Sequence, residues 1–277
     1  MPDAKPAYLH PIELEWGACL RASFAHVRQS WQTEWIGLPT LLSQCLTFLH
    51  IPEHSKDPTV RCLVEAARAV ALQIEIEKGC GTNAGEPGYH NRLHFADALT
   101  TVALQCYVEA LHNKPHDAAW QAALLLAGLA HDFRHPGGVN RHPRDIESAT
   151  VEALTPFLES ANLAPVWTER ITTLILRSDF TMAHENHARV RERAFAWDLD
   201  WATVLLNEAD IMASASEEFG PALSEALASE WKVIQFPAYA TVATEAGRRQ
   251  FLAGIHFSTH SGRLLRAGLD KDYCAGS

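Results

Sequence analysis

The sequence predicts an all-α protein, a bundle of many helices. Apolar residues recur at helical spacing along most of the 277 residues, and no run alternates apolar and polar residues as half-buried strands do. Start and stop signals also bound the helical segments. Asp57-Pro58 places an N-cap acid before a proline at the first helical position, and Pro136-Gly137-Gly138 ends an apolar helix abruptly.

Two regions are expected along the chain. Residues 1–56 form an N-terminal helical region, whose tryptophans at helical spacing indicate packing on the main body. Residues 57–277 form the main domain. Apolar residues at helical period predict its helices at 60–76, 92–111, 117–131, 144–163, 165–177, 185–196, 199–214 and 248–267. The stretch 232–247 is the least helical, because it combines Pro237 with β-branched and aromatic residues.

The composition narrows the class of function. A hydrophobic content of 47% supports a substantial core, and a net charge of −10 argues against a nucleic-acid polymer as partner. A small anionic substrate stays compatible, because bound metal ions would dominate the local field. No basic segment followed by an apolar run begins the chain, no stretch is long enough to cross a membrane, and the six cysteines are scattered. We therefore expect a cytoplasmic protein with reduced thiols.

The stretch 127–140, AGLAHDFRHPGGVN, is the most informative. An apolar helical run delivers His131 and Asp132 side by side at its end, where the loose backbone lets both side chains converge on one centre. Imidazole and carboxylate together suit zinc, iron or manganese. Two ligands do not hold a metal, so further ligands must come from other segments.

Two other segments offer such ligands. In the stretch 88–97, GYHNRLHFAD, Asn91 is a candidate N-cap, His90 lies on the loop edge and His94 lies in the first helical turn. Histidines four apart also occur on ordinary surfaces. In the stretch 205–212, LLNEADIM, Asp210 lies in apolar surroundings, where an unpaired carboxylate is costly. Taken alone, Asp210 would favour an ion pair with arginine.

Together, these three segments predict a metal centre. His94, His131, Asp132 and Asp210 form an N2O2 donor set that leaves positions open for water. The second oxygen of Asp132 can bridge to a neighbouring cation. The groups expected to orient ligands or waters around this centre are Asp97, His135 and Asn140.

The same three motifs resemble the catalytic signatures of the class I 3′,5′-cyclic nucleotide phosphodiesterases, which belong to the HD-domain metal-dependent phosphohydrolase superfamily. The resemblance covers roughly residues 58–265 and is carried by Tyr89-His90-Asn91-x-x-His94-x-Ala96-Asp97, by Ala130-His131-Asp132-x-x-His135-Pro136-Gly137-x-x-Asn140, and by Ala209-Asp210-Ile211. The resemblance implies that family's all-helical fold.

The resemblance also implies a mechanism. By it, the four ligands hold a first metal, zinc or alternatively iron or manganese, and Asp132 bridges to a second, magnesium or manganese. A hydroxide bridging the metals would attack the phosphorus of cAMP or cGMP, and His90 would protonate the departing ribose oxygen to give the 5′-monophosphate.

The departures from the family concern the substrate. The position two places after His131-Asp132 holds Arg134, which either contacts phosphate or points to solvent. Gln250 is the candidate base-recognising amide, although it fits equally well as a polar residue on the exposed side of its helix. The family's asparagine after the third motif is missing, and neither Glu147 nor Glu152 falls in register with the family's glutamate. The candidate substrate contacts are Tyr89, Gln250 and Phe257.

Four functions follow from these observations. The first is a dinuclear-metal phosphodiesterase acting on a cyclic nucleotide. The second is an HD-type phosphohydrolase of another nucleotide or phosphoester, because the base pocket is altered. The third is an HD-type diiron oxygenase, in which His135 or His142 would bind the second metal. The fourth is a non-enzymatic binding module, which the full set of metal ligands disfavours. The sequence leaves open whether the chain pairs as a homodimer.

Overall fold

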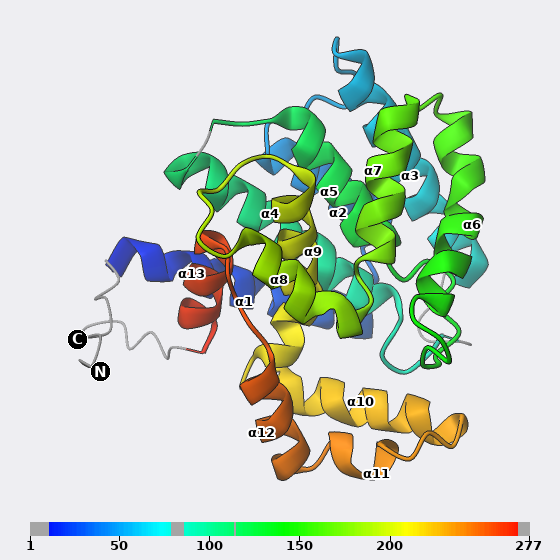
Figure 1. The fold of residues 1–277 in the computed structure, drawn as a ribbon, viewed down its shortest axis with the longest axis vertical. Coiled ribbons are helices and arrows are strands. Elements are labelled where there is room, and N and C mark those ends of the chain that lie inside the picture. Colours follow the sequence, from blue (N-terminus) through cyan, green and yellow to red (C-terminus); the bar gives the residue numbers. More distant parts are fainter. Residues whose placement is uncertain (1–10, 79–85, 114, 271–277) are drawn as a thin grey trace.

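A computed structural model describes residues 11–78, 86–113 and 115–270. Within these ranges the chain forms thirteen α-helices, one 3-10 helix and no strand, so the all-α prediction is confirmed. None of the helices in these ranges combines the length and the apolar character needed to cross a bilayer. The main body (Figure 1) contains α1 (Pro11–Gln32), α2 (Leu38–Phe48), α3 (Pro58–Lys78), α4 (Arg92–His112), α5 (Ala118–Ala130), α6 (Asp145–Ser160), α7 (Pro165–Leu176), η1 (Phe180–Met182), α8 (Ala183–Val190), α9 (Leu199–Ala215) and α13 (His260–Leu269).

Helix α5 lies at the centre of the main body. It is buried on every side from Trp120 to Ala130 and packs against α3, α4, α7 and α9. A helix that is apolar all round is stable only in such an interior position. Because α5 ends inside the protein, it delivers His131 to a buried position, 2% exposed.

The predicted N-terminal region packs on the main body through α1 and α2. Helix α1 lies against α13 and α4, and α2 lies against α3 and α4. Arg28 of α1 donates two hydrogen bonds to the carboxylate of Asp97 on α4, at 2.8 and 2.7 Å. Asp97 is only 2% exposed, so this ion pair supplies the charge that a buried carboxylate requires.

Helices α10 (Gly220–Val233), α11 (Tyr239–Val242) and α12 (Glu245–Gly254) form a separate layer beneath the main body in Figure 1. Helix α10 packs against α9 and α11, and α11 packs against α12. Only Gly220 and Glu230 of α10 are buried, and no residue of α11 or α12 is. The layer therefore contributes little to the apolar core. Glu230 is unusual in it, because it is a charged side chain that is buried.

The structure differs from the predicted helices at the C-terminal end. The single helix predicted over 248–267 is two, α12 and α13, because residues 255–259 leave the helical conformation. Thr259 caps α13 by accepting a hydrogen bond from the Gly262 amide at 2.8 Å. The helix predicted over 185–196 ends at Val190, since Glu192 adopts a positive φ of 64°.

Candidate metal centre

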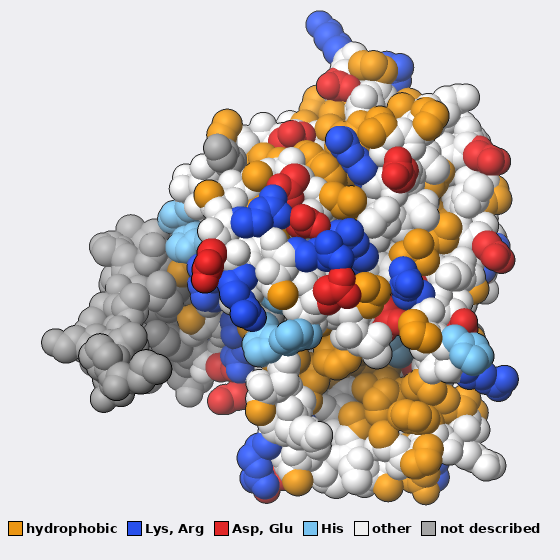
Figure 2. All heavy atoms as spheres, viewed as in Figure 1, with side chains coloured by type: hydrophobic (Ala, Val, Ile, Leu, Met, Phe, Trp, Pro, Cys, Tyr) orange, Lys and Arg blue, Asp and Glu red, His pale blue; other side chains and the backbone are white. Residues whose placement is uncertain are grey.

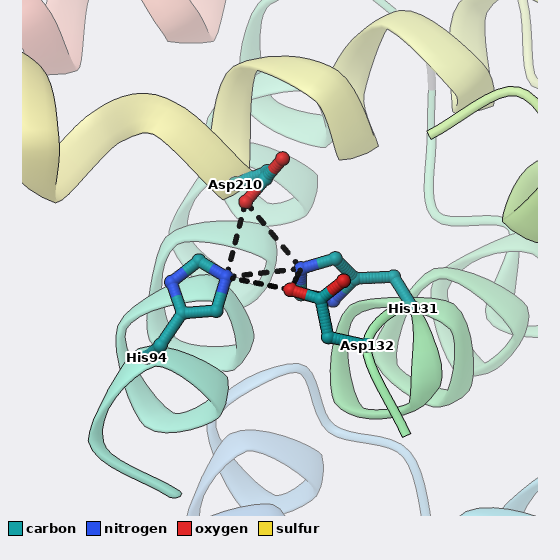
Figure 3. A group of neighbouring side chains, drawn as sticks. All are labelled: His94, His131, Asp132 and Asp210. Carbon is teal, nitrogen blue, oxygen red and sulfur yellow. Dashed lines mark hydrogen bonds and ion pairs between the residues drawn. The ribbon is translucent and has the colours of Figure 1, made fainter. Parts of the chain in front are cut away.

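Four side chains from three distant segments meet inside the main body (Figure 3). Nε2 of His94 lies 3.1 Å from Nε2 of His131, 3.2 Å from Oδ2 of Asp132 and 3.1 Å from Oδ1 of Asp210. Nε2 of His131 lies 3.2 Å from the same Asp132 oxygen and 3.4 Å from that of Asp210. The sequence-predicted ligand set is therefore brought together at one point.

Local signals in the sequence explain how these side chains are positioned. Asn91 caps α4 as predicted, because its side-chain oxygen accepts hydrogen bonds from the amides of Leu93 and His94 at 2.9 and 3.2 Å. His131 is the C-cap of α5, and Asp132 lies just beyond the helix. Neighbouring residues inside a helix would point about 100° apart. At the helix end both can face the same centre.

The spacing and chemistry of the four groups fit a divalent cation. Ligand atoms held tetrahedrally at about 2.0–2.1 Å from a metal lie about 3.3 Å apart, close to the separations observed here. Nδ1 of His131 donates to the Gly128 carbonyl at 3.0 Å, which leaves the Nε2 lone pair facing the cluster. Two nitrogen and two oxygen donors suit zinc, iron or manganese. The cluster is therefore compatible with divalent metal binding.

The electrostatics of the cluster also favour a cation. Burial lowers the pKa of His94, but hydrogen bonds to Asp132 and Asp210 outweigh it and raise that pKa to about 9. Burial raises the pKa of Asp132, but the charges of His131 and His90 hold it well below its usual range. Both carboxylates thus attract positive charge.

A second group of titratable side chains lies beside this cluster. Nδ1 of His90 lies 2.5 Å from Oε1 of Glu230, and the rings of His90 and His135 stack with their centroids 3.6 Å apart. The ring centroids of His90 and His94 are 5.9 Å apart, so the second group lies directly beside the first. Burial is the largest of the effects that lower the pKa of His135 to about 4, so this ring is neutral at pH 7.

Glu230 is the functional candidate that the sequence did not reveal. It lies on α10, and its second oxygen accepts hydrogen bonds from the amides of Tyr89 and His90 at 2.9 and 3.2 Å. Gly137 adopts a φ of +72°, and a Cβ there would lie 3.2 Å from Cγ of Glu230. The glycine of the HPG motif thus admits this carboxylate. No local pattern around residue 230 indicates its role, because its partners lie 140 residues away.

The residues predicted to orient ligands have different partners. Asn140 donates to Glu147 at 2.9 Å and to Asp179 at 3.2 Å. Burial, together with the charges of Asp179 and Asp132, raises the pKa of Glu147, so this glutamate lies within electrostatic reach of the metal cluster. Asp97, in contrast, is engaged by Arg28 of α1.

The predicted substrate contacts do not converge. The Tyr89 hydroxyl pairs with that of Ser214 at 2.9 Å, and its ring lies 4.8 Å from those of His90 and His94. Gln250 is exposed on α12, whereas Phe257 packs against the apolar cluster of α1, α9 and α13.

Arg134 points away from the metal cluster. It has a positive φ of 62°, and its guanidinium pairs with Glu77 of α3. With its side chain 48% exposed, Arg134 occupies the solvent-facing position that the sequence left open.

A cavity of about 310 Å³ opens beside Asp210. It lies between α9, α8 and the loop between α12 and α13. Neither Gln250 nor Phe257 is part of its lining, which consists of Ser178, Phe180, Thr181, Ala183, His184, His187, Asn207, Asp210, Ile211, Gly254, Ile255 and His256.

Comparison with solved structures identifies the fold. The phosphodiesterase domain of the RhoPDE fusion protein from the choanoflagellate Salpingoeca rosetta matches with a TM-score of 0.56 and 15% identity, over 96% of this chain and 90% of that domain. LmjPDEB1 in complex with IBMX matches with a TM-score of 0.62 and 11% identity, over 94% of this chain and 95% of its own. The protein has the fold of a phosphodiesterase domain. No protein-family model and no curated protein sequence matches it.

In this phosphodiesterase-like domain, the main body and the lower layer supply different parts of the site. Helices α4 and α9 carry His94 and Asp210, His131 and Asp132 directly follow α5, and α10 carries Glu230. The predicted resemblance to the cyclic nucleotide phosphodiesterases is confirmed in the fold, over nearly the whole chain.

Proposed function

We propose that the protein is a metal-dependent phosphodiesterase that hydrolyses 3′,5′-cyclic nucleotides to 5′-monophosphates. The observation that carries the proposal is the cluster of His94, His131, Asp132 and Asp210 beside the hydrogen-bonded His90. The phosphodiesterase-domain fold supports the same reaction class. That LmjPDEB1 was solved with the small molecule IBMX supports a small-molecule ligand here as well.

The proposal assigns the four clustered side chains to a first divalent cation, zinc or alternatively iron or manganese. Asp132 would share its second oxygen with a second cation, magnesium or manganese. When bound, these cations would neutralise the charge of the phosphodiester and supply a water of lowered pKa. Asn140 and Glu147 would hold the surrounding polar network in place.

His90 is proposed as the general acid. Its Nδ1 is held by Glu230, so Nε2 is the nitrogen available to the substrate. In the protonated ring, Nε2 would transfer its proton to the ribose 3′ oxygen as the bond from that oxygen to phosphorus breaks. The ionised carboxylate of Glu230 would stabilise the imidazolium before transfer, and the neutral ring would then regain a proton from solvent.

Metal analysis and a substrate panel test this function. Purified protein should contain divalent metal and hydrolyse cAMP or cGMP faster than nucleoside monophosphates or a generic phosphodiester. Asp210→Ala should lose metal and activity together, whereas His90→Ala should retain metal and lose most turnover. Equal turnover in His90→Ala would remove it from the acid role, and hydrolysis of other phosphoesters alone would favour a different HD-type phosphohydrolase.

A diiron oxygenase is the second candidate, and one observation favours it. His90, His135 and Glu230 also bring three ligand atoms within 4.8 Å of one another, so they could bind a second metal. In the structure these groups bond otherwise: His90 to Glu230, and Nδ1 of His135 to the Gly137 amide at 3.1 Å. Two irons per chain with substrate-dependent oxygen consumption would establish the oxygenase and refute hydrolysis as the main reaction.

A further inference from the structure

The cavity beside Asp210 has a lining that suits a neutral heterocycle. Among the described residues that line it, Asp210 carries the only acidic side chain, and there is no lysine or arginine. Away from the proposed metal ligands, the cavity therefore offers no lysine or arginine to pair with a second phosphate or a carboxylate. A neutral ring needs only apolar walls and a few polar groups.

Three histidines supply those polar groups. His184 and His256 have no hydrogen-bond partner within the described part of the chain, and His187 uses only Nδ1, which lies 2.7 Å from the Ser258 hydroxyl. The His256 ring centroid is 6.5 Å from that of His184 and 6.2 Å from that of His187. A neutral imidazole offers one donor and one acceptor, so the cluster has spare capacity of both kinds. Burial is the main effect that lowers the pKa of His187 to about 4, which keeps this ring uncharged at pH 7.

Phe180 adds an aromatic surface at the edge of the same cavity. It lies on η1 and is 58% exposed. Its only ring neighbour among the described residues is Phe251, with centroids 6.5 Å apart. An exposed phenyl ring beside a cavity offers its face to a planar ligand. Ile211 and Ile255 form apolar walls of the cavity.

We propose that this cavity receives the nucleobase of the substrate, which stacks on Phe180 and forms hydrogen bonds with His184 and His256. The inference rests on the proposed function, because Asp210 joins the cavity to the metal cluster where the phosphodiester would react. Gln250 is exposed on α12 and is not part of the lining, so the histidines take the role expected of that amide. Figure 2 shows histidine side chains gathered where the main body meets the α10–α12 layer.

Steady-state kinetics with two kinds of substrate test the proposal. The metal-loaded enzyme is compared on cAMP or cGMP and on 1-O-methylribose 3′,5′-cyclic phosphate, which has the same phosphodiester but no nucleobase or other planar ring. Phe180→Ala should lower kcat/KM for the cyclic nucleotide about ten-fold more than for the base-free substrate, and His256→Ala should do so to a smaller extent. Phe48→Ala on α2 and His54→Ala, both at exposed positions, are the matched controls. Equal losses on both substrates would overturn the proposal.

Equilibrium binding separates this inference from the proposed function. Adenosine and guanosine carry the base without a phosphodiester, so the metal-loaded protein binds but cannot hydrolyse them. Isothermal titration should give a Kd for at least one nucleoside that rises about ten-fold in Phe180→Ala and stays constant in Phe48→Ala. No binding to the unmodified protein, or equal Kd values in both variants, would refute the base site. Phe180-dependent binding without cyclic nucleotide hydrolysis would keep the base site and refute the proposed activity.

Discussion

Replacing Glu230 by glutamine should show whether the buried carboxylate activates His90. The substitution keeps the size of a side chain that is 6% exposed and retains one oxygen to accept from the Tyr89 and His90 amides. It replaces the oxygen 2.5 Å from Nδ1 of His90 with an amide that donates. The neutral imidazole can accept from that amide, whereas the imidazolium, with a proton on Nδ1, cannot.

The expected loss follows from the hydrogen bond removed. A hydrogen bond to a charged group contributes about 1.5–3 kcal/mol, so kcat for a cyclic nucleotide should fall about ten- to hundred-fold. Bis(p-nitrophenyl) phosphate releases a phenolate that needs little protonation, so its hydrolysis should fall much less. Glu225→Gln, at an exposed position of the same helix, is the control. Similar losses on both substrates, or loss of bound metal, would refute the reasoning.

Three further predictions concern stability. Because the pKa of His187 is about 4 in the folded protein, the unfolded chain binds more protons than the folded protein at pH 5. Lowering the pH from 7.5 to 5 should therefore reduce the unfolding free energy of the unmodified protein by on the order of 2 kcal/mol more than that of the His187→Gln variant, measured by urea unfolding. An equal pH response in both would contradict this. Arg28→Met leaves the buried Asp97 carboxylate unpaired and should cost about 3–5 kcal/mol of unfolding free energy. Adding Asp97→Asn to the Arg28→Met variant should recover part of the lost unfolding free energy. If the effects of the two single substitutions simply added in the double variant, the ion pair would be excluded as the cause. Metal at 100 times its Kd stabilises by about 2.7 kcal/mol, so EDTA should lower Tm by about 5 °C or more. Asp210→Asn should abolish that response; an unchanged shift would show that the metal binds elsewhere.

The fold and the meeting of the four clustered side chains were predictable because local signals encode them. The Asn91 cap fixes where α4 begins and hence where His94 lies. The apolar run of α5 can be stable only inside the protein, and it ends at His131. Each of the four side chains therefore lies at an element whose start, end or burial is evident from a short stretch of sequence.

The rest of the site depends on tertiary contacts that short stretches do not encode. Glu230 lies on α10, outside the predicted helices, and pairs with a histidine 140 residues earlier in the chain. The cavity needs Phe180 and His256 to meet beside Asp210, and these residues come from three separate elements. Gln250 and Phe257 were placed on one helix, and the break between α12 and α13 separates them.

Glu208 explains why the chain breaks there and why that break shapes the site. This fully buried glutamate on α9 accepts hydrogen bonds from the amides of Ser258 and Thr259 at 2.5 and 2.9 Å, and from the Thr259 hydroxyl. These bonds stabilise the open conformation of residues 255–259, whose amides would otherwise continue the helix. The same segment carries His256 to the cavity wall, and Asp210 follows Glu208 by two residues. Helix α9 therefore carries a proposed metal ligand, Asp210, and also Glu208, which anchors the segment of the proposed base site, so the distance between the two proposed sites depends on this one helix.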